Sequence, residues 1–337
     1  MTMPVKPVND RIFYLDWVKV IACFLVIYAH LFSGNSLTCK YIYAFHVPLF
    51  FLVSGIFHHR ENEHKIEWRQ PFLSLIVPTI LFIVIDGIAY SLQFGQERGI
   101  FQELLVFAKT IMLGLIRGSI LNPYWFLIAL FWCKIFTDAI LSIKRYLPSL
   151  LIWATFLIIP LLLDNRLPLL LSQGLMGLPF YIAGVFAGTY LKTLQPDWRF
   201  ILLVIPCLLL TVILSSLNGK VSMNGVFFGS LPMGLNMIAF YINAAIGCIL
   251  VLAISLLPFP KWGFISSLSK SLITIVGLQI IFIRLFNQFI GADRPFFISF
   301  FAALIIMLLC HVLHFFMNPL YQKIRHVLPE RRSANAS

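Results

Sequence analysis

Three ionisable side chains share one face of an apolar stretch near the N-terminus. Asp16 precedes Lys19 by three residues, and His30 follows Lys19 by eleven. At about 100° per residue, eleven residues make three helical turns plus roughly 20°, so Lys19 and His30 project from one face about 16 Å apart. Asp16 joins that face at the i, i+3 spacing. A neutral imidazole in such a stripe can take a proton from an alcohol, which is the chemistry of acyl transfer to a hydroxyl.

A second histidine opens the next apolar run, FHVPLFFLVSG (45–55). Pro48 stands in the first turn, where the missing N–H costs nothing. The first run ends on the side of the membrane where the second begins, so His30 and His46 are predicted to converge at one level. The alternative keeps Asp16 and Lys19 as interfacial residues that snorkel to headgroups, with His30 capping its helix and His46 bonded to a loop carbonyl.

The composition of the chain indicates what kind of structure must position these ionisable side chains. The chain has 337 residues, 60% of them hydrophobic and 11% charged, with a mean hydropathy of +0.92, which excludes a soluble globular domain. The apolar runs are continuous and about 20 residues long, which predicts an all-α, polytopic integral membrane protein and not a transmembrane barrel. The net charge is +12, but the basic residues lie in short loops and form no continuous basic face. Nucleic acid is therefore not an expected partner.

Hydropathy predicts about ten transmembrane helices. They cover residues 12–32, 42–58, 70–92, 123–141, 147–163, 168–190, 199–216, 231–256, 263–285 and 295–317. The run 101–117 is interrupted by Lys109 and is expected to be an interfacial or re-entrant helix. Lysine and arginine concentrate in the loops on the side that holds both termini, so both termini are predicted to be cytoplasmic. We expect one transmembrane domain over 1–322 and a basic, partly disordered cytoplasmic tail over 323–337.

No metal site is expected. The six cysteines are scattered along the chain. His58, His59 and His64 form a charged loop with neighbouring glutamates, and a solvated loop is the interpretation we adopt for them.

Several stretches resemble the acyltransferase-3 family of integral membrane O-acyltransferases. LDWVKVIACFLVIYAH (15–30) and FHVPLFFLVSG (45–55) are similar to the family's first two motifs. RQPFLSLIVP (69–78) resembles its arginine-containing entry to the third helix, and NPYWFLIALF (122–131) its Trp-Phe-Leu element. SLSKSLITIVGLQIIF (267–282) is similar to a late motif of the fucose 4-O-acetylase-like branch.

The resemblance implies transfer of an acyl group, usually acetyl from acetyl-CoA, to a hydroxyl of an envelope carbohydrate or lipid-linked glycan. Lys19, Arg69 and Arg60 would then bind the donor's phosphates at the cytoplasmic mouth. His30 would act as general base or carry the acyl group covalently.

In the same scheme His46 would assist as the second imidazole, and Asp16 would pair with Lys19 and orient it. Two residues depart from the family pattern. Lys19 replaces the usual arginine and lacks its bidentate fork, and Gln279 stands where many members carry histidine.

Other polar residues within the predicted spans are candidates for the acceptor site. Asp86 is either functional or a paired structural carboxylate. Asn236 could line an acceptor cavity or bond between helices. Tyr124 and Trp125 could form a platform for a sugar or an interfacial aromatic belt. Arg117 could face an anionic acceptor or lipid headgroups.

The leading hypothesis is therefore an O-acetyltransferase of a bacterial-type inner (plasma) membrane, with acyl-CoA and a carbohydrate as partners. The alternative is a proton-coupled secondary transporter, in which the same ionisable groups would form a relay.

Overall fold

The chain is all-α, as predicted. A computed structural model describes residues 12–32, 37–59, 66–118, 123–143, 167–218, 223, 232–291 and 295–327. Helices make up 86% of these residues, and no strand occurs among them. The described helices are α1 (Phe13–His30), α2 (Leu37–Tyr43), α3 (His46–Ile56), α4 (Arg69–Pro71), the π-helical turn η1 (Phe72–Ile76), α5 (Val77–Arg98), α6 (Ile100–Arg117), α7 (Trp125–Leu141), the 3₁₀ turn η2 (Pro168–Leu170), α9 (Leu171–Leu191), the 3₁₀ turn η3 (Trp198–Phe200), α10 (Ile201–Asn218), α11 (Met233–Ser255), α12 (Gly263–Lys270), α13 (Leu272–Ile290) and α14 (Phe296–Val327).

Eight helical stretches of the described chain are long and apolar enough to cross a membrane. They correspond to the first three and the last five predicted spans, which confirms a polytopic membrane protein. The predicted span 123–141 forms α7, a shorter helix of 17 residues. The predicted span 147–163 lies outside the described residues, so the total of ten and the side of the termini stay predictions.

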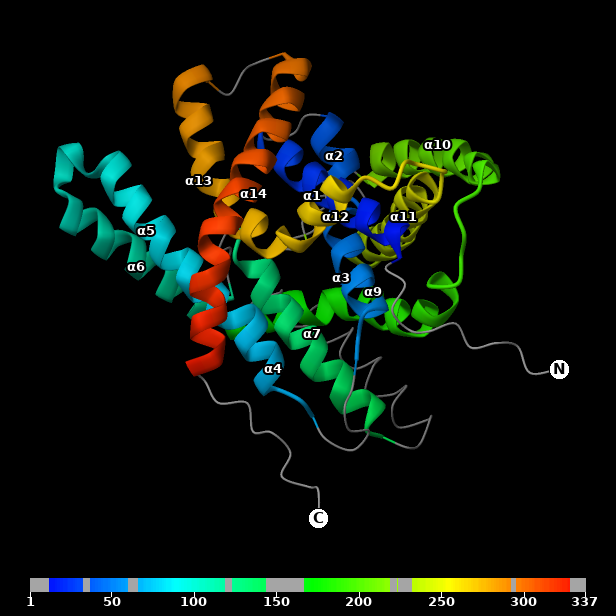
Figure 1. Ribbon diagram of the computed structural model, residues 1–337, viewed down its shortest axis with the longest axis horizontal. Helices are drawn as coiled ribbons and strands as arrows, with labels where there is room; N and C mark the ends of the chain where they lie inside the picture. The colour runs from blue at the N-terminus through cyan, green and yellow to red at the C-terminus, as the bar shows by residue number, and fades with distance from the viewer. Residues whose placement is uncertain are drawn as a thin grey trace.

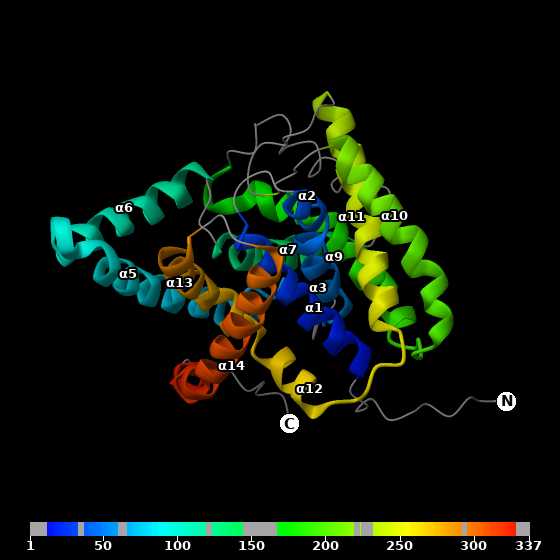
Figure 2. The same ribbon diagram turned by 90° about the horizontal axis from the view of Figure 1, so that it is seen from above.

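Helix α1 lies at the centre of the molecule (Figures 1 and 2). It contacts α3, α11, α12, α13 and α14, and its side chains are buried on more than one face, because nearly the whole helix is apolar. Asp16 is only 4% exposed. Its carboxylate therefore faces protein, which argues against snorkelling to headgroups.

Helices α3 and α9 pack in direct backbone contact. A Cβ atom at Gly55 would overlap the carbonyl of Tyr181, and one at Gly184 would overlap the carbonyl of Leu52. Only glycine permits this close approach. The contact holds the C-terminal half of α3 against the middle of α9, which is where the cavity described below is found.

Three predicted boundaries differ from the structure. The span 42–58 is divided, since α2 ends at Tyr43 and α3 begins at His46. The span 263–285 is divided at Ser271, whose hydroxyl donates to the Leu268 carbonyl and bonds Nδ1 of His311. Helix α14 continues to Val327, five residues into the predicted tail, and residues 328–337 lie outside the described ranges.

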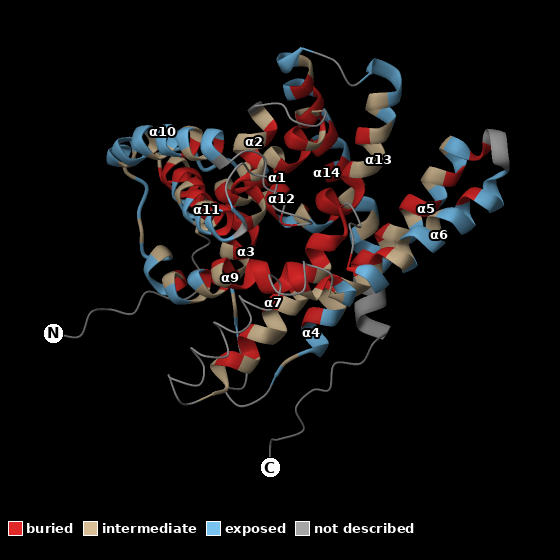
Figure 3. Cartoon of the chain, turned by 180° about the vertical axis from the view of Figure 1, so that it is seen from behind, coloured by how far each residue is buried: buried red, intermediate tan, exposed pale blue. Residues whose placement is uncertain are grey.

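Helices α5 and α6 form an antiparallel hairpin at one side of the molecule, and α10 and α11 form a pair at another (Figures 1 and 2). Both the hairpin and α10 carry many exposed residues (Figure 3). The segment predicted as an interfacial or re-entrant helix is α6, and its position relative to a bilayer stays a prediction.

Candidate functional site

His30 and His46, the two histidines predicted to converge, both lie near the ring of Tyr43. His30 is the last residue of α1, His46 is the first of α3, and Tyr43 ends the short helix between them. The Tyr43 hydroxyl lies 3.5 Å from Nδ1 of His30. The Tyr43 ring centroid is 4.9 Å from that of His46 and 6.2 Å from that of His30. The ends of α1 and α3 thus gather two imidazoles and a phenol into one cluster.

Backbone contact fixes the tautomer of His46. Nδ1 lies 2.7 Å from the Ile42 carbonyl oxygen, which can only accept, so Nδ1 carries the proton. In the neutral ring Nε2 is then the acceptor nitrogen. His46 is 3% exposed, whereas His30 is half-buried. A neutral imidazole with an oriented Nε2 can take a proton from an alcohol.

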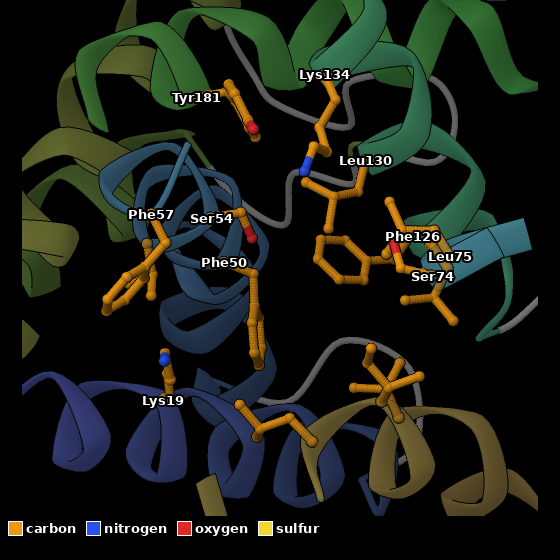
Figure 4. A pocket seen from close by; sticks show the side chains of 15 residues that line it. Lys19, Phe50, Ser54, Phe57, Ser74, Leu75, Phe126, Leu130, Lys134 and Tyr181 are labelled. Carbon is orange, nitrogen blue, oxygen red and sulfur yellow. The ribbon is translucent and has the colours of Figure 1, made fainter. Parts of the chain in front are cut away.

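A cavity of about 300 Å³ lies nearer the opposite ends of α1 and α3 (Figure 4). Its polar lining comprises two ammonium groups, Lys19 and Lys134, and hydroxyls from Ser54, Ser74 and Tyr181. The remaining lining residues are apolar: Phe50, Val53, Phe57, Leu75, Phe126, Leu127, Leu130, Leu272, Ile273 and Val276. The arrangement suits a ligand with an anionic end and an apolar or amide-rich body.

Lys19 faces this cavity from α1. Its Nζ lies 4.1 Å from the centroid of the Phe57 ring, a cation–π contact that helps to hold an ammonium away from bulk water. The π-helical turn η1 contributes Ser74 and Leu75 to the lining of the same cavity. Such turns are frequent at functional sites.

Comparison with known families decides the class of the protein. The family model described as an acyltransferase domain matches residues 12–315, a range that runs from the residue before α1 well into α14. The chain belongs to the acyltransferase-3 family. No curated protein and no solved structure matches the chain. The protein is therefore a polytopic membrane acyltransferase.

Asp16 of this acyltransferase anchors α12 to α1. Its carboxylate accepts hydrogen bonds from the Ser266 hydroxyl at 3.0 Å and from the Ser269 hydroxyl at 2.5 Å. Asp16 and His30 are fourteen residues apart on one helix, which is about 21 Å along the axis. The structure thus does not bring Asp16 to the imidazoles.

The structure does not place the other two predicted donor-binding residues, Arg69 and Arg60, at the cavity. Arg69 is exposed at the start of α4, about one turn before Ser74, and does not line the cavity. Arg60 lies outside the described residues.

Among the predicted acceptor residues, Tyr124 and Trp125 are buried, at 1% and 7% exposure. The Tyr124 hydroxyl donates to the Phe82 carbonyl at 3.4 Å, and the Trp125 ring packs against Phe126. Neither ring offers an open face to a sugar in this conformation.

The buried Asp86 forms an ion pair with the partly buried Arg284, a residue absent from the predicted site. Nη2 of Arg284 contacts Oδ1 of Asp86, and the guanidinium lies 5.4 Å from the Tyr90 ring centroid. The Tyr124 hydroxyl lies beside the same carboxylate. This is the paired carboxylate that sequence reasoning left open. A lone arginine in an otherwise apolar span was the available signal for its partner.

The remaining candidates are separate from both groups. Gln279 is fully buried on α13, where its amide lies 3.5 Å from the Val276 carbonyl. Asn236 is buried on α11, and Asn243, two turns along that helix, bonds Ser215 of α10 at 2.8 Å. Arg117 is exposed at the end of α6. In the described ranges no three His, Cys, Asp or Glu side chains gather as a metal site.

Proposed function

We propose that this acyltransferase transfers an acetyl group from acetyl-CoA to a hydroxyl of a cell-envelope carbohydrate or lipid-linked glycan, within a bacterial-type inner (plasma) membrane. One observation carries the proposal: the basic cavity and the imidazole pair lie toward opposite ends of the same two helices. On α1, Lys19 and His30 are separated by about 16 Å, and on α3, His46 and Ser54 by about 12 Å.

That separation matches the shape of an acyl-CoA. The donor carries phosphates at one end and a thioester at the other, joined by an extended arm with two amides. The phosphates would lie by Lys19 and the thioester by His30 and His46. Phe50, one turn after His46 on α3, lines the cavity, so the cavity reaches toward the imidazole cluster.

In the proposed reaction Nε2 of His46 takes the proton of the acceptor hydroxyl. The acceptor oxygen attacks the thioester carbonyl carbon, the new C–O bond forms, the C–S bond breaks, and coenzyme A leaves as its thiolate. His30, which contacts the same tyrosine, would orient the acceptor or the carbonyl. General-base assistance of this kind contributes about 10²–10⁴-fold in rate.

The test measures release of free coenzyme A thiol from acetyl-CoA by the purified, full-length protein with a crude envelope glycan. We expect wild-type turnover, its loss in His46→Ala, and its retention in His59→Ala, which changes an exposed histidine. Thermal unfolding shows whether each variant is folded. A folded wild-type protein without donor turnover, together with proton-coupled uptake in vesicles, would contradict the proposal.

The acceptor class is tested in cells. Deletion of the protein should remove acetate esters from surface glycans, and expression of wild-type protein should restore them. Unchanged ester content in the deletion strain would exclude an envelope acceptor.

A further inference from the structure

The cavity contains a second cation that the sequence did not single out. Lys134 points into it from α7, across from Lys19 on α1 (Figure 4). In the part of the chain that the structure describes, Lys134 has no carboxylate within ion-pair distance. An ammonium directed into a half-enclosed cavity calls for an anionic ligand.

A buried chain of three side chains stands beside Lys134. The Tyr181 hydroxyl, from α9, lies 3.0 Å from Nδ1 of His58. Nε2 of His58 lies 3.3 Å from Oδ1 of Asp138, an ion-pair distance without the alignment of a hydrogen bond. The side chains of His58 and Asp138 are 4% and 5% exposed. The interpretation of His58 as part of a solvated loop is therefore wrong, because α7 and α9 cover it.

The carboxylate of Asp138 is held away from the cavity. Its Oδ2 accepts from the backbone N–H of Glu67 at 3.2 Å, and its Oδ1 faces His58. Asp138 follows Lys134 by one helical turn, so it offsets the lysine's charge nearby while the ammonium still faces the cavity.

The proton on His58 decides what Tyr181 offers to a ligand. When His58 is neutral, its Nε2–H faces Asp138 and Nδ1 accepts the Tyr181 proton. When His58 is protonated, both nitrogens donate, and the Tyr181 O–H is free to donate into the cavity. The protonated state also adds a positive charge near the ligand.

We propose that Lys134 and Tyr181 complete a phosphate-binding site opposite Lys19, and that the buried His58–Asp138 pair couples the affinity of this site to pH. The inference rests on the proposed function, since it takes the ligand to be the phosphates of the acyl-CoA donor. Lys134 and Tyr181 are binding residues, and His58 and Asp138 are positioning residues.

The direction of the pH effect follows from the groups around His58. Asp138 faces it from α7 and Tyr181 from α9. Lys134 and Glu67 act on Asp138, the first through its charge and the second through its backbone N–H. Lys19 and Lys192 approach the ring of the adjacent Phe57. Protonation of His58 frees the Tyr181 O–H to donate to the ligand and adds positive charge near it, so donor affinity should rise as the pH falls.

The experiment measures equilibrium binding to the full-length protein of three probes: coenzyme A, dephospho-coenzyme A and pantetheine. Lys134→Ala should weaken coenzyme A binding about tenfold or more and leave pantetheine binding unchanged. Lys109→Ala, an exposed lysine on α6, should leave both unchanged. A loss that persists with dephospho-coenzyme A assigns Lys134 to the pyrophosphate, and a loss that disappears assigns it to the 3′-phosphate.

The pH arm uses Tyr181→Phe and His58→Gln, each checked for folding by thermal unfolding. Wild-type affinity for coenzyme A should increase from pH 8 to pH 6. His58→Gln should lack this increase, and Tyr181→Phe, which keeps the charge of His58 but loses the hydroxyl, should show a smaller one. Unchanged coenzyme A binding in folded Lys134→Ala, or the same pH profile in all three proteins, would overturn the inference while the proposed function stands. Wild-type protein that binds no coenzyme A would contradict the proposed function itself.

Discussion

The imidazole end and the basic end of the site are assembled in different ways. The imidazole cluster comes from residues within one short stretch: Tyr43 is thirteen residues from His30, and His46 bonds the carbonyl four residues before it. The basic end is gathered from distant segments, since His58 and Tyr181 are 123 residues apart and Glu67 and Asp138 are 71 apart.

This difference indicates a division of tasks. A cluster built from neighbouring residues keeps its geometry as long as α1, α2 and α3 are in place, which suits a proton transfer that tolerates little displacement. A cavity built from α1, α3, α7, α9 and α13 changes shape when any of these helices shifts.

The largest expected effect comes from breaking the imidazole end. His30→Ala and His46→Ala should each lower turnover by about 10²–10⁴-fold. Because the proposed mechanism places the two rings in one reaction, the double variant should be little worse than the more damaging single variant. Steady-state rates of thiol release measure this. Multiplicative losses would instead mean that the two histidines act independently.

The Asp86–Arg284 ion pair is a third polar group, separate from the imidazole end and the basic end. Removing one of its members tests whether the pair is structural or belongs to the acceptor site. Asp86→Ala should lower the free energy of unfolding by about 1–3 kcal/mol, because the partly buried guanidinium of Arg284 loses its partner. The double change Asp86→Leu with Arg284→Met should recover most of that stability, measured by denaturant unfolding in detergent. If the double variant is stable yet inactive, the pair belongs to the acceptor site and is not only structural.

The glycine contact between α3 and α9 offers a way to disturb the basic end without changing a charge. Gly184→Ala should lower the free energy of unfolding by about 1–3 kcal/mol, because its methyl group would overlap the Leu52 backbone. It should also weaken coenzyme A binding, since Tyr181 lies on the same helix. Gly234→Ala, with open space around the added carbon, is the matched control. Equal thermal midpoints for the two variants would show that α3 and α9 can separate at no cost.

The smallest effect is expected from Lys19→Arg. The change keeps the charge and adds a bidentate fork, so donor binding should be retained, whereas Lys19→Ala should weaken donor binding more than acceptor binding. Michaelis constants for the two substrates measure this. An unchanged donor constant in Lys19→Ala would remove Lys19 from the donor site.

Much of the architecture was accessible from the sequence because it depends on local pattern. Continuous apolar runs predicted the helices, and Pro48 in the first turn of α3 was consistent with a helix start near His46. The break at Ser271 was not predicted, although the residues before it, SSLSK (266–270), are mostly polar. Its hydrogen bond to His311, forty residues away, is a tertiary contact that no local pattern reveals. The solvated-loop interpretation of His58 failed for the same kind of reason, because its partners Asp138 and Tyr181 come from other helices.

By itself, the sequence determined that this is a helical membrane protein with Lys19 and His30 on one face of its first helix, because helix periodicity fixes the relation between residues on the same helix. Tertiary structure alone decided that Asp16 is held by Ser266 and Ser269, that Arg284 neutralises Asp86, and that Lys134 faces Lys19. Each of these arrangements brings together helices far apart in the chain. The free energy that selects them comes from packing and from pairing buried charges, which no local pattern encodes.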